Sequence, residues 1–285
     1  MIAAALVALA VTLAWPVPRI MARQRTFRRA PRAALVAWQA VTVSAILAAL
    51  AAAPAILPLV LFDGQTVYQH FMIMAVAVAV SGVVLGRLLL AGRRIGRGMR
   101  QRRRQHRELV DIIARQHRDH VRVLEHPTVT AYCLPGREKR VVLSQGVIDT
   151  LTPSQLDAVL AHEEAHLAAR HDLLLEFFSV IHETVPEPLR CQAAMSEVRL
   201  LVEALADRAS VRRVGELATA QALLALADSR APEAAMGVGT ALTAPTRLKI
   251  IAAGRPNPAL PLAMYAYAAA LVAAPLALVA AAWRP

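Results

Sequence analysis

Cysteine, aromatic side chains and acidic side chains are all scarce in this chain of 285 residues. Cys133 and Cys191 are the only cysteines, which is too few for a disulfide framework, so we expect both to be reduced and buried. Aromatic residues make up 4% of the chain and supply no row of stacking platforms for a nucleic acid. The sequence has no internal repeat, no glycine-rich phosphate loop and no serine-nucleophile motif. A disulfide-stapled domain and a nucleotide-binding enzyme are therefore both disfavoured.

The residues that are abundant are aliphatic or basic. Hydrophobic residues make up 57% of the chain, and the mean hydropathy is +0.45, too apolar for an ordinary soluble domain. The formal net charge is +12, with 32 basic residues against 20 acidic ones. In an apolar chain such an excess more often reflects anionic lipid and membrane topology than nucleic acid, so no nucleic-acid partner is expected.

Four apolar runs are long enough to cross a membrane, and they predict a multi-pass protein. A signal peptide fits the first run poorly, because no basic residue precedes it. The predicted organisation is three transmembrane helices within residues 1–92, a domain outside the membrane over 93–258 and a fourth transmembrane helix over 259–285. The first three helices are expected at about residues 2–18, 33–62 and 71–92.

Arginine-rich loops predict the orientation of these spans. Residues 19–32 and 87–107 carry many arginines and no acid, whereas residues 63–70 hold Asp63 and no Lys or Arg. By the positive-inside rule the two basic loops are cytoplasmic. We therefore expect an inner or plasma membrane protein with its N-terminus outside and the domain over 93–258 in the cytoplasm. The arginines are also expected to lie against anionic lipid headgroups.

One short motif points to metal chemistry. Residues 162–166 read H-E-E-A-H, and a helix would place His162 and His166 one turn apart on the same face. Two imidazoles so placed can bind one zinc ion, with Glu163 as the general base. Thr152 and Gln155 have capping-box spacing ahead of this segment, which favours a helix. The alternative is a pair of surface histidines on an amphipathic helix.

A mononuclear zinc site needs a third protein ligand, and Glu203 is the candidate. Asp207 lies four residues later on the same helical face, where it can accept a hydrogen bond from the outer nitrogen of a ligating histidine. An exposed carboxylate pair beside Arg208 is the plain alternative. His171 is predicted to lie off the ligand face, either behind a ligand or in solvent.

The segments around the motif have their own predicted structures. Residues 128–147 are expected to form two strands joined by a turn at Pro135-Gly136. Residues 108–127 are expected to be helical, residues 153–185 to form the metal-binding helix and its continuation, and residues 190–229 one or two further helices. Residues 231–258, rich in Pro and Gly, are expected to be mostly loop.

H-E-E-A-H followed by E-A-L-A-D resembles the gluzincin metallopeptidases, specifically their integral-membrane branches. The closest resemblance is to family M56, known for antibiotic-sensing receptors, with family M48 of membrane peptidases a close second. The resemblance covers about residues 128–208. It implies that His162, His166 and Glu203 bind one zinc ion, that Glu163 is the catalytic base and that Asp207 supports a ligand.

The expected fold is a mostly α membrane protein, with four transmembrane helices and an inserted α+β zincin-like (gluzincin) metallopeptidase domain, the cytoplasmic domain over 93–258. The expected function is hydrolysis of peptide bonds in a protein or peptide substrate, as a regulatory M56-like endopeptidase. Receptor-type M56 members carry an extracellular sensor after the last helix, and its lack here disfavours β-lactam sensing. An M48-like quality-control peptidase and a non-enzymatic membrane scaffold stay open as alternatives.

Overall fold

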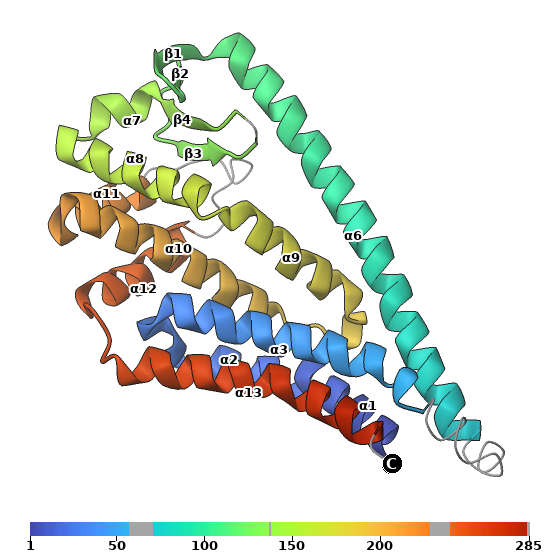
Figure 1. Cartoon of the computed structure of the whole chain (residues 1–285). Helices are drawn as coiled ribbons and strands as arrows, with labels where there is room; N and C mark the ends of the chain where they lie inside the picture. Colours follow the sequence, from blue (N-terminus) through green and yellow to red (C-terminus); the bar gives the residue numbers. More distant parts are fainter. Residues whose placement is uncertain (57–70, 137, 229–239, 284–285) are drawn as a thin grey trace. The chain divides into compact units, whose positions relative to one another are not determined.

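The computed structural model describes residues 1–56, 71–136, 138–228 and 240–283 (Figure 1). Within these residues four helical stretches are long and apolar enough to cross a membrane, as expected. They are α1 with α2 (Ile2–Ala14 and Pro16–Arg23), α3 (Pro31–Ala51), the Met74–Ile113 part of α6 (Phe71–Ile113), and α13 (Ala259–Ala282). The end of the predicted second span and the predicted outer loop with Asp63 lie outside the described residues.

The chain divides into two compact units. The first unit contains Met1–Ile95, Phe177–Val198 and Pro256–Pro285. The second unit contains Gly96–Glu176 and Arg199–Arg255. Residues 177–198, which fall inside the predicted peptidase domain, therefore group with the apolar helices in one unit.

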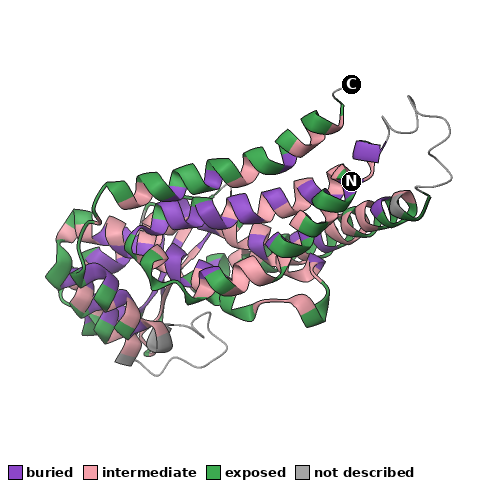
Figure 2. Cartoon of the chain, turned by 90° about the horizontal axis from the view of Figure 1, so that it is seen from below, coloured by how far each residue is buried: buried purple, intermediate pink, exposed green. Residues whose placement is uncertain are grey.

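In the first unit, α3 packs against α1 and α13. Small side chains form much of this contact, since Ala3, Ala10, Ala48 and Ala49 are buried in one apolar cluster with Leu6. Alanine is a strong helix former and lets helix backbones approach closely. The last helix, whose ribbon ends at the C-terminus in Figure 2, is largely exposed. An exposed helix of this hydropathy is suited to contact with lipid chains.

Arginine side chains anchor residues 177–198 within the first unit. Arg87 of α6 donates hydrogen bonds to the carbonyls of Glu183 and Thr184 at the C-terminus of α9 (His171–Thr184). Arg28 forms a two-point ion pair with Glu197 near the start of α10 (Gln192–Val214). The last carbonyls of a helix have no partner within the helix, so the guanidinium of Arg87 satisfies groups that would otherwise be unpaired.

The second unit contains a four-stranded sheet in the order β1-β2-β4-β3. The strands are β1 (Arg115–Arg118), β2 (Val121–Leu124), β3 (Ala131–Leu134) and β4 (Arg140–Ser144). Strands β2 and β4 are parallel, and the other two pairs are antiparallel. Val141 and Leu143 of β4 are fully buried beside Val159 and Leu167 of α8 (Pro153–Ala168), so the central strand supports the helix that carries H-E-E-A-H.

One prediction for this part of the chain is wrong and another is confirmed. Residues 108–127 are helical only as far as Ile113, and the rest form β1 and β2. Val121 and Val123 are buried and alternate with the half-buried Arg122 and Leu124, a period of two that indicates a strand. The expected hairpin over 128–147 is present as β3 and β4, paired in antiparallel register.

The helical predictions also need correction. The helix expected over 153–185 is two helices, because it is interrupted at Arg170, whose φ of 51° is left-handed. Residues 240–252 were expected to be loop and instead form α12 (Thr240–Ala252), with Pro245 inside the helix. The remaining helices of this region are α7 (Gln145–Thr150), α10 and α11 (Glu216–Asp228). The two cysteines are free as expected, but both are only half-buried.

Candidate active site

The site is built on α8, whose first turn is held by side chains. The hydroxyl of Thr152 accepts a hydrogen bond from the backbone N–H of Gln155, and the Gln155 side chain accepts one from the backbone N–H of Thr152. Pro153 occupies the first helical position. This capping box is the one that the sequence predicts, and it satisfies donors that the helix itself leaves unpaired. The helix therefore begins at a fixed residue and carries the motif nine residues later.

Three side chains from two helices converge at the centre of the second unit. The Nε2 atoms of His162 and His166 on α8 lie 3.1 Å apart. Glu203 of α10 places one carboxylate oxygen 3.4 Å from His162 Nε2 and the other 3.5 Å from His166 Nε2. The candidate ligand atoms of the three residues all lie within 4.8 Å of one another. Two imidazole nitrogens and one carboxylate oxygen are a donor set that could hold a metal ion.

Both histidines have a partner on their outer nitrogen. His162 Nδ1 lies 3.0 Å from Oδ1 of Asp207, a carboxylate that is almost fully buried. His166 Nδ1 lies 3.0 Å from Nδ1 of His171, which is also buried. Such contacts fix the orientation of an imidazole and the nitrogen on which its hydrogen resides. His171 was predicted to lie either behind a ligand or in solvent, and it lies behind the candidate ligand His166.

Arg247 of α12 holds the two acids of α10. Its guanidinium donates to both oxygens of Asp207, at 2.8 Å for the Nε contact, and lies 3.1 Å from an oxygen of Glu203. The Arg247 side chain is only 4% exposed. Asp207 is almost fully buried and Glu203 is half-buried, and both carboxylates contact this one guanidinium, which offsets their mutual repulsion.

Glu163 faces the same site and meets the edge strand β3. Its carboxylate is hydrogen-bonded with the thiol of Cys133. Burial raises the pKa of Glu163 above that of an ordinary glutamate, although the charge of His162 opposes the shift. Burial and the neighbouring carboxylate of Glu163 raise the pKa of Cys133, so the thiol stays protonated. A carboxylate with a raised pKa is a stronger base than an exposed one.

The protonation of the histidine pair is uneven. Burial alone would lower the pKa of His162, but hydrogen bonds with Asp207 and Glu203 raise it to about 10. Burial lowers the pKa of His166 to about 3. Burial opposes ionisation of Glu203, yet its contacts with His162 and Arg247 hold its pKa below the usual value. The metal-free site thus carries one imidazolium, on His162, between two carboxylates.

The structure brings together all five residues selected from the sequence: His162, Glu163, His166, Glu203 and Asp207. The roles of Arg247 and Cys133 escaped sequence reasoning. Arg247 falls in a stretch that was expected to be mostly loop, and it is α12 that brings its guanidinium to the acids of α10. The four residues of β3, A-Y-C-L, give no sign that the cysteine would meet Glu163.

Comparison with known families decides between the two resemblances. The model for peptidase family M48 matches residues 98–244, more than half of the chain. No curated protein and no solved structure gave a match. The match does not support family M56, which the sequence resemblance placed first. Both families share the H-E-x-x-H and E-x-x-x-D pattern, so these motifs alone could not distinguish them. The chain belongs to peptidase family M48, whose members are metal-dependent peptidases.

Proposed function

We propose that this chain is a membrane-embedded zinc endopeptidase of the gluzincin type. In this proposal His162, His166 and Glu203 hold one zinc ion, and Glu163 is the catalytic base. The convergence of these three ligand groups within 4.8 Å, beside the half-buried carboxylate of Glu163, is the observation that carries the proposal. A structural zinc site would instead tend to have four protein ligands and would not need Glu163, which disfavours the scaffold alternative.

The outer contacts fit metal binding through both Nε2 atoms. The hydrogen of each imidazole would then reside on Nδ1, where His162 donates to Asp207 and His166 donates to His171. His171 accepts on Nδ1 and so carries its own hydrogen on Nε2. Among the described residues that Nε2 atom is buried without a hydrogen-bond partner.

When bound, zinc supplies Lewis-acid chemistry, which acidifies water and polarises a carbonyl group. Glu163 takes a proton from the water that attacks the scissile carbonyl carbon, and then delivers it to the leaving amine. Strand β3 is at the edge of the sheet, and its Cys133 contacts Glu163. An extended substrate paired with that free edge would be held in register next to the base.

The proposed organisation has four membrane spans with the peptidase domain, residues 93–258, in the cytoplasm. Four apolar helices support the membrane location, and the arginine loops support the orientation. Within this organisation we propose the M48-like role of cleaving membrane proteins in quality control, because the family match favours that alternative over regulation by an M56-like peptidase.

The first test compares the purified full-length wild type with Glu163→Gln and with the matched control Glu164→Gln. Glu164 is the adjacent residue, but its carboxylate is ion-paired with Arg213 near the surface. We expect all three proteins to bind one zinc ion per chain. Glu163→Gln should lose at least about 100-fold of its cleavage of an unfolded protein, the usual size of a general-base contribution. Glu164→Gln should retain cleavage.

Retained cleavage in Glu163→Gln would refute the assignment of the base. Loss of zinc from Glu163→Gln would instead show a structural effect of the change. The substrate class is tested by comparing new protein N-termini in cells that express wild type or Glu163→Gln. Many wild-type-specific cuts in membrane-protein loops support quality control. One or two cuts in a soluble regulator would indicate a signalling peptidase.

A further inference from the structure

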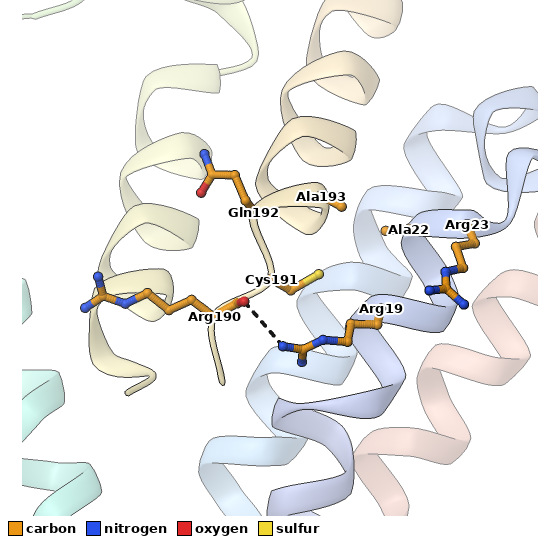
Figure 3. Close-up of a pocket in the computed structure, with 7 residues that line it drawn as sticks. All are labelled: Arg19, Ala22, Arg23, Arg190, Cys191, Gln192 and Ala193. Atoms are coloured by element: carbon orange, nitrogen blue, oxygen red, sulfur yellow. Dashed lines mark hydrogen bonds between the residues drawn. The ribbon is translucent and has the colours of Figure 1, made fainter. Parts of the chain in front are cut away.

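A cavity in the first unit is lined by three arginines and by no acidic residue (Figure 3). Its volume is about 300 Å³. One wall is formed by Arg19, Ala22 and Arg23 of α2, and the other by residues 190–193, where α10 begins. The excess of positive charge makes this cavity suitable for an anion.

The charges of Arg19 and Arg23 are not balanced by acids. Arg19 donates hydrogen bonds to three backbone carbonyls, those of Trp15 at 2.9 Å, Leu189 at 3.3 Å and Arg190 at 3.4 Å. These bonds hold its guanidinium in place but leave its charge uncompensated. Arg23 is exposed and has no ion-pair partner within the described part of the chain.

Two acids near the cavity are already engaged elsewhere. Glu183 lies 3.4 Å from Arg190, whose guanidinium extends away from Arg19 in Figure 3. Glu197 is held by Arg28. An anion that enters the cavity would therefore meet Arg19 and Arg23, one helical turn apart on α2, without displacing an internal ion pair.

The cavity lies at the end of the first candidate span, Ile2–Arg23. Trp15 is 46% exposed, and the Arg19 guanidinium lies 5.6 Å from the centre of its ring. Exposed tryptophan and arginine near a span terminus are typical of the headgroup level of a bilayer. Ile20, 57% exposed, offers an apolar surface on the same short helix. A ligand with a phosphate and attached acyl chains matches both the charge and the location.

We propose that this cavity binds the phosphate of an anionic membrane phospholipid through Arg19 and Arg23. This is a specific site, distinct from the general attraction of arginine-rich loops to an anionic surface. A free phosphate ion shares the chemistry of the headgroup, so the test separates the two sources.

Cys191 lines the cavity and provides a native reporter. The full-length protein is placed in nanodiscs of phosphatidylcholine alone, or of phosphatidylcholine mixed with phosphatidylglycerol. The rate of maleimide alkylation at Cys191 is then followed by peptide mass spectrometry. A third sample, in detergent with inorganic phosphate, measures protection by the free ion. Cys133, which lies in the second unit, serves as the internal reference for folding.

The matched variants are Arg23→Gln and Arg25→Gln. Both remove one positive charge from the same basic loop, but Arg25 does not line the cavity. We expect phosphatidylglycerol to slow alkylation of Cys191 in the wild type and in Arg25→Gln. In Arg23→Gln the lipid affinity should fall about fivefold, the effect of about 1 kcal/mol for one basic residue at an anionic surface.

Three results would overturn the proposal. Equal protection by both lipid mixtures would show simple shielding by the bilayer. Equal loss of protection in the two variants would show diffuse electrostatic attraction. Protection by inorganic phosphate as strong as that by phosphatidylglycerol would assign the cavity to a soluble anion. Lipid-specific protection that depends on Arg23 and not on Arg25 would support it.

Discussion

Arg247 carries a buried positive charge that both acids of α10 depend on. It contacts Asp207 and Glu203, and Asp207 in turn contacts His162. Removing one member of a buried ion-pair network leaves the others buried without compensation, which is costly. The geometry of the candidate metal ligands is thus linked to a residue about 40 positions further along the chain.

Replacing Arg247 with Met should therefore destabilise the protein and weaken zinc binding. We expect a loss of about 3–5 kcal/mol in the free energy of unfolding, the typical cost of breaking a buried pair. Zinc affinity should fall about 10- to 100-fold, as it does when a residue that orients a ligand is lost. The measurements are thermal unfolding and zinc titration with a competing chelator.

Arg213→Met is the control, because Arg213 forms its ion pair with Glu164 at a half-exposed position. An exposed pair is usually worth less than about 1 kcal/mol, so this variant should remain close to wild type. Similar losses in Arg213→Met and Arg247→Met would contradict the importance given to the buried pair.

Zinc binding should release close to one proton per ion at neutral pH. The pKa of His162 is about 10, so this imidazole is charged in the metal-free protein and must become neutral to bind zinc. His166, with a pKa of about 3, is already neutral, and Glu203 is already ionised. Affinity should therefore rise about tenfold per pH unit up to the pKa of His162.

Calorimetry in two buffers of different ionisation enthalpy counts these protons. Asp207→Asn is the informative variant, because it removes a carboxylate that raises the pKa of His162. Fewer protons should then be released. Release of two protons, or of none by the wild type, would show that the charge distribution in the metal-free site is different.

At the scale of single residues, the site was largely predictable because most of its residues share a helix. His162, Glu163 and His166 share one helix, as do Glu203 and Asp207, so residue spacing alone indicates which side chains face the same way. Arg247 lies on a third helix, and spacing along the chain carries no information about contacts between helices. His171 follows a change of direction at Arg170, so helical periodicity could not decide between its two predicted positions.

At the scale of elements, the long periodic helices were predictable from the sequence, whereas the short strands and the helix that contains a proline were not. β1 and β2 have four residues each, too few to show alternation clearly beside a long basic helix. Pro245 and the nearby glycines suggested a loop where α12 forms. Packing against α11 stabilises α12, because Ile251 of α12 is buried in a cluster with Leu223 of α11.

The turn from β4 into α7 depends on a glycine. A Cβ atom on Gly146 would lie 2.1 Å from the backbone oxygen of Pro127, which cannot move independently of the chain. Gly146→Ala should therefore cost about 1–3 kcal/mol or more, as overpacking does in well-packed cores. The expected result is a lower melting temperature and lower zinc occupancy, because β4 supports α8.

Gly98→Ala provides the control for this prediction. Gly98 lies inside α6, and a Cβ atom there would meet nothing within 4 Å. Alanine is the better helix former, so this variant should be neutral or slightly more stable. Equal melting temperatures for Gly146→Ala and the wild type would mean that the backbone around Pro127 can adjust.

At the scale of the whole molecule, the predicted orientation is open to direct labelling. Single cysteines at Arg25, Arg102 and Gln65 are labelled with a membrane-impermeant maleimide in intact and in lysed cells. The arginine-rich loops should react only after lysis, and Gln65 should react in intact cells. Reaction of Arg25→Cys in intact cells would invert the proposed topology.

The hydrogen bonds from Arg87 and the ion pair from Arg28 have a practical consequence for anyone preparing the enzyme. A shortened fragment that begins after Ile95, made to avoid the first three spans, would lack Arg28 and Arg87. The carbonyls at the end of α9 and the carboxylate of Glu197 would then lose their arginines. Phe178, which is buried, lies in the same stretch of the first unit. We expect such a fragment to aggregate, so that detergent-solubilised full-length protein is the proper starting material for assays.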